Sequence, residues 1–136
     1  IFIKRIRHYT TFEYIEIPEL KNTSSLSKEQ IKEKEAELIL KYVKNTDKVV
    51  LLDERGKNFT SIEWSKELEK EIVSGTRSLI FIVGGAYGFS KTIYERANGK
   101  LSLSSMTFSH QIIRLFFIEQ LYRAFTIMKG EPYHNE

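Results

Sequence analysis

Two continuous apolar runs constrain the fold of this chain most strongly. Lys48–Leu52 carries Val-Val-Leu-Leu after its lysine, and Ser78–Val83 is a second run of aliphatic and aromatic side chains. Neither run alternates with polar residues, as a strand with one exposed face would. Runs of this kind are typical of parallel strands that helices cover on both faces. They predict an α/β fold, with a mostly parallel sheet and helices on both faces.

The other elements follow from capping signals and residue type. Two helices begin with a capping box, in which Ser or Thr is followed three residues later by Gln or Glu. The strand candidates are rich in apolar, β-branched and aromatic side chains. The sequence predicts strands at Phe12–Ile17 and Leu101–Leu103, and helices from Ser27 to about Lys44, from Thr60 to near Gly75, from about Lys91 to Ala97, and from about Gln111 to Met128.

Composition excludes several classes of protein. The 136 residues are 41% hydrophobic and 29% charged, as expected for one globular domain spanning residues 1–136. The chain has no cysteine, which excludes a disulfide framework, a thiol nucleophile and a thiolate zinc site. Its three histidines lack the spacing of metal ligands, so we expect no metal site. No apolar run reaches the ~18 residues of a membrane span, so we expect a cytoplasmic protein. The chain opens with Ile1 rather than Met, and we expect that an N-terminal piece precedes it.

Three loops follow the predicted strands, where ligands of α/β sheets bind: Asp53–Lys57, Gly84–Tyr87 and Ser104–His110. Gly84–Gly88 either brings its backbone close to a ligand or makes a tight turn that needs glycine. Asp53–Lys57 is either a ligand-facing loop or, as the segment alone favours, a solvated charged turn. Leu101–His110 mixes hydroxyl and apolar side chains. That mixture suits a pocket for a purine, and equally a buried connection.

The last helix is apolar around most of its circumference, so it has to be buried on more than one side. A partner subunit is the cover that we expect, and a central position under the chain's own sheet is the alternative. Glu119 and Arg123 are spaced for an ordinary ion pair. Beyond the helix, Pro132–His134 offers side chains that stack on an unpaired base, although chain ends are commonly frayed.

Five motifs appear in order along the chain: Leu51–Lys57, Val83–Phe89, Leu101–His110, Glu119–Ala124 and Pro132–His134. Together they resemble one known family, the SPOUT-class ribosomal RNA large subunit methyltransferase H. The resemblance implies one SPOUT domain with a C-terminal trefoil knot, whose N-terminal strand is missing from this chain. It also implies a homodimer that uses S-adenosylmethionine to methylate nitrogen 3 of a pseudouridine in the helix 69 loop of 23S ribosomal RNA.

The resemblance also implies site residues. The RNA-facing catalytic set is His110, Arg114, Tyr133 and His134, and the site is completed across the dimer interface. Either histidine is a candidate for the general base, because imidazole exchanges protons near neutral pH. Asn135 stands where many relatives have a basic residue. The residues expected to bind S-adenosylmethionine are Leu52, Gly85, Leu103, Ser104, Ser105, Met106, Thr107 and Phe108, with Gly84 added because it adjoins Gly85.

Two other functions are consistent with the same sequence. A non-catalytic module that binds RNA or the ribosome would keep the fold without using a cofactor pocket. Another nucleotide-binding α/β enzyme would instead bind a nucleoside triphosphate or a dinucleotide. Calorimetry with S-adenosylmethionine distinguishes the methyltransferase from both.

Overall fold

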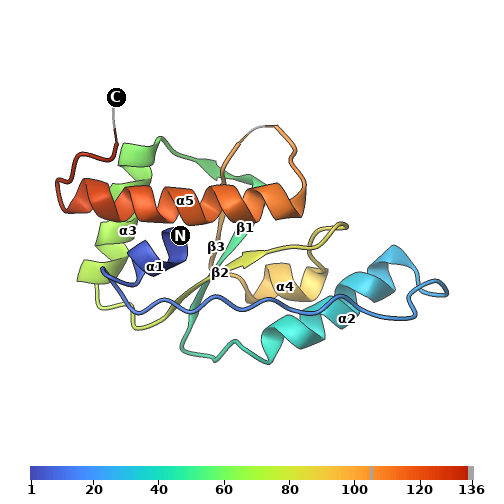
Figure 1. Cartoon of the computed structure of the whole chain (residues 1–136). Helices are drawn as coiled ribbons and strands as arrows, with labels where there is room; N and C mark the ends of the chain where they lie inside the picture. The colour runs from blue at the N-terminus through green and yellow to red at the C-terminus, as the bar shows by residue number, and fades with distance from the viewer. Residues whose placement is uncertain (105, 135–136) are drawn as a thin grey trace.

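A computed structural model describes residues 1–104 and 106–134 of the chain (Figure 1). The expectations for Ser105 and Asn135 concern residues outside these ranges. The elements, in chain order, are α1 (Phe2–Ile6), α2 (Lys28–Leu40), β1 (Lys48–Asn58), α3 (Ser61–Val73), β2 (Leu79–Val83), α4 (Lys91–Arg96), β3 (Gly99–Ser102) and α5 (His110–Met128).

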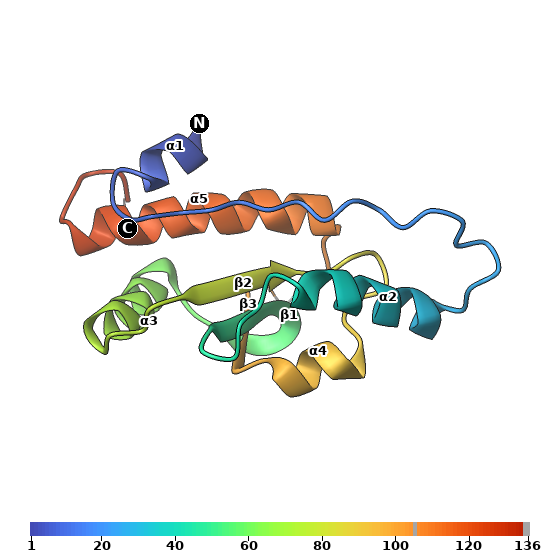
Figure 2. The ribbon, with the colours of Figure 1, turned by 90° about the horizontal axis from the view of Figure 1, so that it is seen from below.

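The three strands form one sheet in the order β2-β1-β3, and both pairings are parallel. Figure 2 shows α5 and α1 on one side of this sheet, with α2 and α4 on the other. Helix α3 packs against α5. The predicted α/β fold, with a parallel sheet covered by helices on both faces, is therefore confirmed.

The apolar run of β1 is continuous because its two faces enter two different hydrophobic clusters. Val49 and Leu51 pack with Ala36 of α2 and Ile93 of α4. Leu52 packs on the opposite face, in the cluster built by α1, α3 and α5. Burying one such aliphatic side chain contributes about 1.5–3 kcal/mol. A polar residue on either face of β1 would lose that contribution.

Both predicted capping boxes form, at Ser27 of α2 and Thr60 of α3. Helix α2 nevertheless ends at Leu40, so the expected end near Lys44 is wrong. The chain is turned there by Asp47, whose side chain accepts a hydrogen bond from the Lys44 backbone at 2.7 Å. Arg96 then donates to the carbonyls of both Lys44 and Asp47, at 2.8 Å each.

The expected strand at Phe12–Ile17 is wrong. This stretch is part of an extended segment that leads from α1 to α2 without pairing with a strand (Figure 1). Its contacts come from side chains instead: Arg7 Nε donates to the Phe12 carbonyl at 3.0 Å, and Glu16 pairs with Arg114. Strand composition alone does not make a strand, because a ladder also needs a neighbouring edge.

β1 is longer than expected, and the Asp53–Lys57 segment lies inside it rather than after it. Leu52 and Lys57 both pair with Leu101, so the residues between them leave the ladder. The two backbones then meet closely, since a β-carbon on Gly56 would lie 2.7 Å from the carbonyl carbon of Lys100. β3 itself starts and ends earlier than the predicted Leu101–Leu103.

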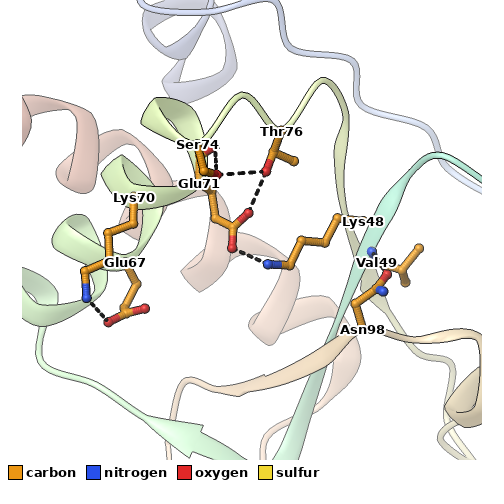
Figure 3. A network of polar contacts seen from close by, with 8 residues as sticks. All are labelled: Lys48, Val49, Glu67, Lys70, Glu71, Ser74, Thr76 and Asn98. Carbon is orange, nitrogen blue, oxygen red and sulfur yellow. Dashed lines mark hydrogen bonds and ion pairs between the residues drawn. The ribbon is translucent and has the colours of Figure 1, made fainter.

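Polar contacts hold the amino end of β1 in place (Figure 3). Glu71 of α3 accepts hydrogen bonds from Lys48 and, at 2.8 Å, from Thr76. The Asn98 side chain accepts from the Val49 backbone at 2.8 Å. These contacts fix the amino end of β1. The carboxyl ends of the strands, at the opposite edge of the sheet, are where a ligand can bind.

Candidate active site

A cavity of about 950 Å³ lies at the carboxyl ends of the strands, a volume suited to a small ligand. Its walls come from the end of β1, from the glycine loop after β2 and from the segment between β3 and α5. These are the three segments that the sequence placed at the ligand-binding edge. Every described residue of the predicted cofactor set lines it, namely Leu52, Gly84, Gly85, Leu103, Ser104, Met106, Thr107 and Phe108.

The glycine loop is a tight turn and a wall of the cavity at once. Gly88 adopts a positive φ of 81°, and its amide donates to the Gly85 carbonyl at 3.1 Å. A β-carbon on Gly84 would lie 3.2 Å from the ring of Phe89, which is tighter than an ordinary contact. Glycine is therefore needed both for the turn and for the space beside it, and the backbone stays open to the cavity.

The segment between β3 and α5 has the two kinds of surface expected of a purine site. Its hydroxyl groups are engaged: Ser104 Oγ accepts from the Met106 amide at 3.0 Å, and Thr107 Oγ1 donates to Glu54 at 2.7 Å. Its apolar side chains are partly open, with Met106 71% and Phe108 36% exposed. The exposure of Met106 and Phe108 argues against a fully buried connection, while the bond of Ser104 to a backbone amide is the contact that such a connection predicts.

Asp53, Arg55 and Tyr94 fix the wall on the β1 side. Asp53 accepts hydrogen bonds from the Tyr94 hydroxyl and, at 2.8 Å, from the Arg55 amide. Burial opposes ionisation of Asp53, but these hydrogen bonds and the Arg55 charge outweigh it, so its pKa lies below the ordinary value. Arg55 and Lys100 both lie over the Tyr94 ring, 5.0 and 5.1 Å from its centre. The charged segment is thus more than a solvated turn.

His110 lines the cavity as the first residue of α5, next to the N-cap Ser109. Arg114 follows one helical turn later and pairs with Glu16 of the extended N-terminal segment. Two of the four predicted catalytic residues therefore lie at the cavity end of α5.

Tyr133 and His134 follow the other end of α5 in the sequence, and the tail that carries them folds back onto the second half of the helix. The Tyr133 hydroxyl donates to Glu119 at 2.9 Å. Arg123 pairs with Glu119 at 2.7 Å and is hydrogen-bonded to His134 Nδ1 at 2.8 Å. Because guanidinium only donates, Nδ1 is the acceptor, which leaves the ring proton on Nε2. Burial and the bond to Glu119 raise the pKa of Tyr133, so its hydroxyl stays protonated at neutral pH.

One chain does not bring the predicted catalytic set together. α5 has 19 residues, so its ends are about 28 Å apart at ~1.5 Å per residue. His110 is at one end, whereas Tyr133 and His134 fold back to bond with Glu119 and Arg123. Glu119 and Arg123 lie about 14 and 20 Å along the helix from His110. Between them α5 carries an exposed apolar face, in which Ile112, Leu115 and Phe116 are 43%, 59% and 43% exposed. Part of the apolar helix is therefore uncovered by its own chain.

Several contacts around the site were not predicted. The expected ion pair of Glu119 and Arg123 is confirmed, but its second task, holding the tail, was missed. The bonds of Glu16 and Glu54 had no signal at all, because their partners are 98 and 53 positions away.

Among residues 1–104 and 106–134, no group of three or more His, Asp or Glu side chains could hold a metal ion. Within the same described ranges, no helix combines the length and the apolar character needed to cross a membrane.

The chain resembles known proteins over almost its whole length. Residues 1–134 match the family described as "Predicted SPOUT methyltransferase". A protein named "Ribosomal RNA large subunit methyltransferase H" from Flavobacterium johnsoniae is 56% identical over 135 residues, which cover 99% of this chain and 86% of that protein. Proteins of the same name from Christiangramia forsetii and Bacteroides fragilis are 56% and 54% identical, with the same coverage.

Proposed function

The chain belongs to the SPOUT methyltransferase family, and we propose that it methylates large-subunit ribosomal RNA with S-adenosylmethionine as the methyl donor. The proposed target is nitrogen 3 of a pseudouridine in the helix 69 loop of 23S RNA, and the proposed location is the cytoplasm. One observation carries the proposal. Eight residues from three separate segments, all predicted from the sequence to contact the donor, line one cavity together with His110.

The residues present fit an adenosine-containing donor. At Gly84 and Gly85 the loop brings backbone without a side chain to the cavity, and Leu52, Leu103 and Phe108 offer apolar surface. The hydroxyl groups of Ser104 and Thr107 each make a hydrogen bond within the protein, and these bonds fix the shape of the pocket wall. When bound, the donor supplies an electrophilic methyl group on a sulfonium centre.

The chain's own residues then prepare the nucleophile. The imide nitrogen of pseudouridine has to lose its proton, and the site favours this by stabilising the negative charge that results. Arg114 is the proposed cation for that charge or for an adjacent phosphate. His110 and His134 remain the candidates for accepting the proton. The Arg123 bond at Nδ1 favours His110, because His134 then presents a donor rather than an acceptor at Nε2.

The proposed active unit is a homodimer whose sites are completed across the interface. Two observations support it: His110 lies at the start of α5 while the tail contacts the helix only from Glu119 onward, and α5 carries an exposed apolar face between them. Two copies with their α5 helices antiparallel would bring His110 of one protomer near the tail of its partner. The trefoil knot expected for the C-terminal half is part of the same proposal.

The decisive experiment is mass spectrometry of the helix 69 fragment of 23S RNA from cells with and without this gene. We expect the fragment to lose one methyl group when the gene is deleted and to regain it on complementation. Complementation by Arg114→Ala, Tyr133→Ala and His134→Ala, tested singly, should fail or be strongly reduced. Unchanged methylation in the deletion strain would refute the proposed target.

Completion across the interface is tested by mixing two inactive variants. His110→Ala with Arg114→Ala disables one end of α5, and Tyr133→Ala with His134→Ala disables the other. A heterodimer of the two has one site with all four residues intact, so mixing should restore transfer to about a quarter of the wild-type rate for random pairing. If all four residues acted within one chain, no activity would return.

The alternative of a non-catalytic RNA-binding module predicts no use of a donor. Titration calorimetry of the wild-type protein with S-adenosylmethionine separates the two functions. We expect saturable binding with one donor per cavity. A nucleoside triphosphate or dinucleotide serves as the comparison ligand and should bind weakly or not at all.

A further inference from the structure

Glu35 provides a carboxylate beside the cavity that belongs to neither the predicted cofactor residues nor the predicted catalytic residues. Glu35 lies on α2 and reaches across to the glycine loop, where a β-carbon on Gly85 would lie 2.6 Å from its Oε2 atom. Lys32, one turn earlier on the same helix, is among the residues that line the cavity. The Glu35 carboxylate thus lies against Gly85, a residue of the cavity wall that has no side chain.

Glu35 differs from the other carboxylates around the cavity in having no partner. Asp53 is bonded to Tyr94 and Arg55, and Glu54 to Thr107. In the described part of the chain, Glu35 makes neither a hydrogen bond nor an ion pair, and the nearby Lys32 is paired with Glu29 at 2.8 Å. Its acceptor oxygens therefore carry no hydrogen bond within the described residues, and they lie against Gly85, which lines the cavity.

The charge environment of Glu35 also calls for a cation. The side chain is partly buried, and this burial raises its pKa, while a positive charge on His110 would act in the opposite direction. A desolvated carboxylate without a counter-ion is costly, and a bound cation relieves that cost. A ligand with a positive group near Gly85 would therefore be favoured.

We propose that Glu35 binds the ammonium group of the donor's methionine moiety. This inference rests on the proposed function, because it takes S-adenosylmethionine as the ligand. The donor has two positive groups, and only the ammonium has N–H bonds for a charge-assisted hydrogen bond. The sulfonium has none, and a carboxylate beside its methyl group would compete as a nucleophile. Glu35 is thus a binding residue for the amino acid end of the ligand.

The test compares two ligands that differ in the amino acid part. S-adenosylhomocysteine keeps the ammonium group, whereas 5′-methylthioadenosine has the same adenosine and thioether without it. In the full chain, Glu35→Gln should weaken S-adenosylhomocysteine binding about tenfold, the loss of one charge-assisted hydrogen bond. Binding of 5′-methylthioadenosine should stay within about twofold of wild type, since its contacts lie elsewhere. Titration calorimetry measures both.

Glu37→Gln is the matched control, because it removes the same charge from an exposed position on the same helix. It should bind both ligands as the wild-type protein does. Unchanged S-adenosylhomocysteine binding in Glu35→Gln would overturn the inference, and so would equal weakening of both ligands, which would mean that Glu35 shapes the glycine loop. Absence of S-adenosylhomocysteine binding by wild-type protein would refute the proposed function as well, so the two failures are distinguishable.

Discussion

At Gly56 the backbone of β1 runs directly against the backbone of β3. A β-carbon there would lie 2.7 and 2.8 Å from backbone atoms of Lys100 and Leu101, which have no freedom to rotate away. We expect Gly56→Ala to lower the free energy of unfolding by about 1–3 kcal/mol, the usual cost of overpacking. Donor affinity should fall too, because Leu101 also lines the cavity. Urea denaturation and calorimetry measure the two effects.

Gly99→Ala is the control for this substitution. A β-carbon at Gly99 would meet no described atom within 4 Å, and its φ is not positive. Its unfolding free energy should stay within about 0.5 kcal/mol of wild type. Equal stability of the two variants would contradict the close approach at Gly56.

Glu119 is the residue on which the C-terminal tail depends, since Tyr133 and Arg123 both bind its Oε1 atom. We expect Glu119→Gln to reduce methyl transfer to ribosomes about tenfold, because the tail loses a charged acceptor that positions it. Donor binding should not change, because Glu119 is not among the described residues that line the cavity. Filter binding of transferred methyl label and calorimetry separate these effects. Glu69→Gln, at an exposed position of α3, is the control and should leave both unchanged.

At this scale, the sequence predicted contacts between neighbours on one helix and missed contacts between distant segments. The Glu119–Arg123 pair follows from helical spacing. The bond of Arg114 to Glu16 and the approach of Glu35 to Gly85 depend on how the N-terminal segment and α2 are placed. No local pattern encodes that placement.

Glu71 ties the end of α3 to the start of β1 through Lys48 and Thr76 (Figure 3). The hydrogen bond from Lys48, and then that from Thr76, holds the pKa of Glu71 below its ordinary value of 4.5. A lowered carboxyl pKa adds stability above the ordinary pKa, and that stability is lost as the pH falls through the folded value. We expect Glu71→Gln to cost less than about 1 kcal/mol at pH 7, since Glu71 is partly exposed.

The measurement is thermal unfolding of wild type and Glu71→Gln at several pH values from 7 to about 3. The difference between them should shrink below pH 4.5. Glu67→Gln is the control, because Glu67 contacts Lys70 at 3.5 Å on an exposed helix face, where ion pairs contribute little. A difference that grew on acidification would contradict the assigned shift.

Whole elements were predictable where the signal is local. The two capping boxes and the apolar runs of β1 and β2 are complete within a few residues, and each is confirmed. The predicted strand at Phe12–Ile17 does not form, because pairing requires a free strand edge from another part of the chain. The end of α2 failed because Arg96, more than fifty positions later, holds the turn. The departure of β1 from its ladder depends likewise on the path of β3.

The exposed apolar face of α5 belongs to the scale of the whole molecule. If it is the interface of the proposed homodimer, a charge at Leu115 should break it, because a buried unpaired carboxylate is strongly unfavourable. We expect Leu115→Glu to sediment as a monomer, to lose methyl transfer, and to retain donor binding. Sedimentation velocity and calorimetry measure these properties.

Val73→Glu provides the comparison for Leu115→Glu. Val73 is an apolar residue of α3 that is 81% exposed, so the same charge should leave the assembly and its activity unchanged. A monomeric wild-type protein, or a Leu115→Glu variant that remained dimeric and active, would remove the support for a shared site.

The pairing of α1 with α5 has a consequence for how the chain folds as it is synthesised. Tyr9 stacks on Phe125 and bonds to Glu131, 122 positions later. The cluster between the sheet and α2 and α4 uses residues only up to Ala97 and can pack early. The opposite face of the sheet has only α1 and α3 to cover it until the final helix leaves the ribosomal exit tunnel. A nascent chain stalled before that point would expose the apolar residues that α5 covers to solvent and to chaperones.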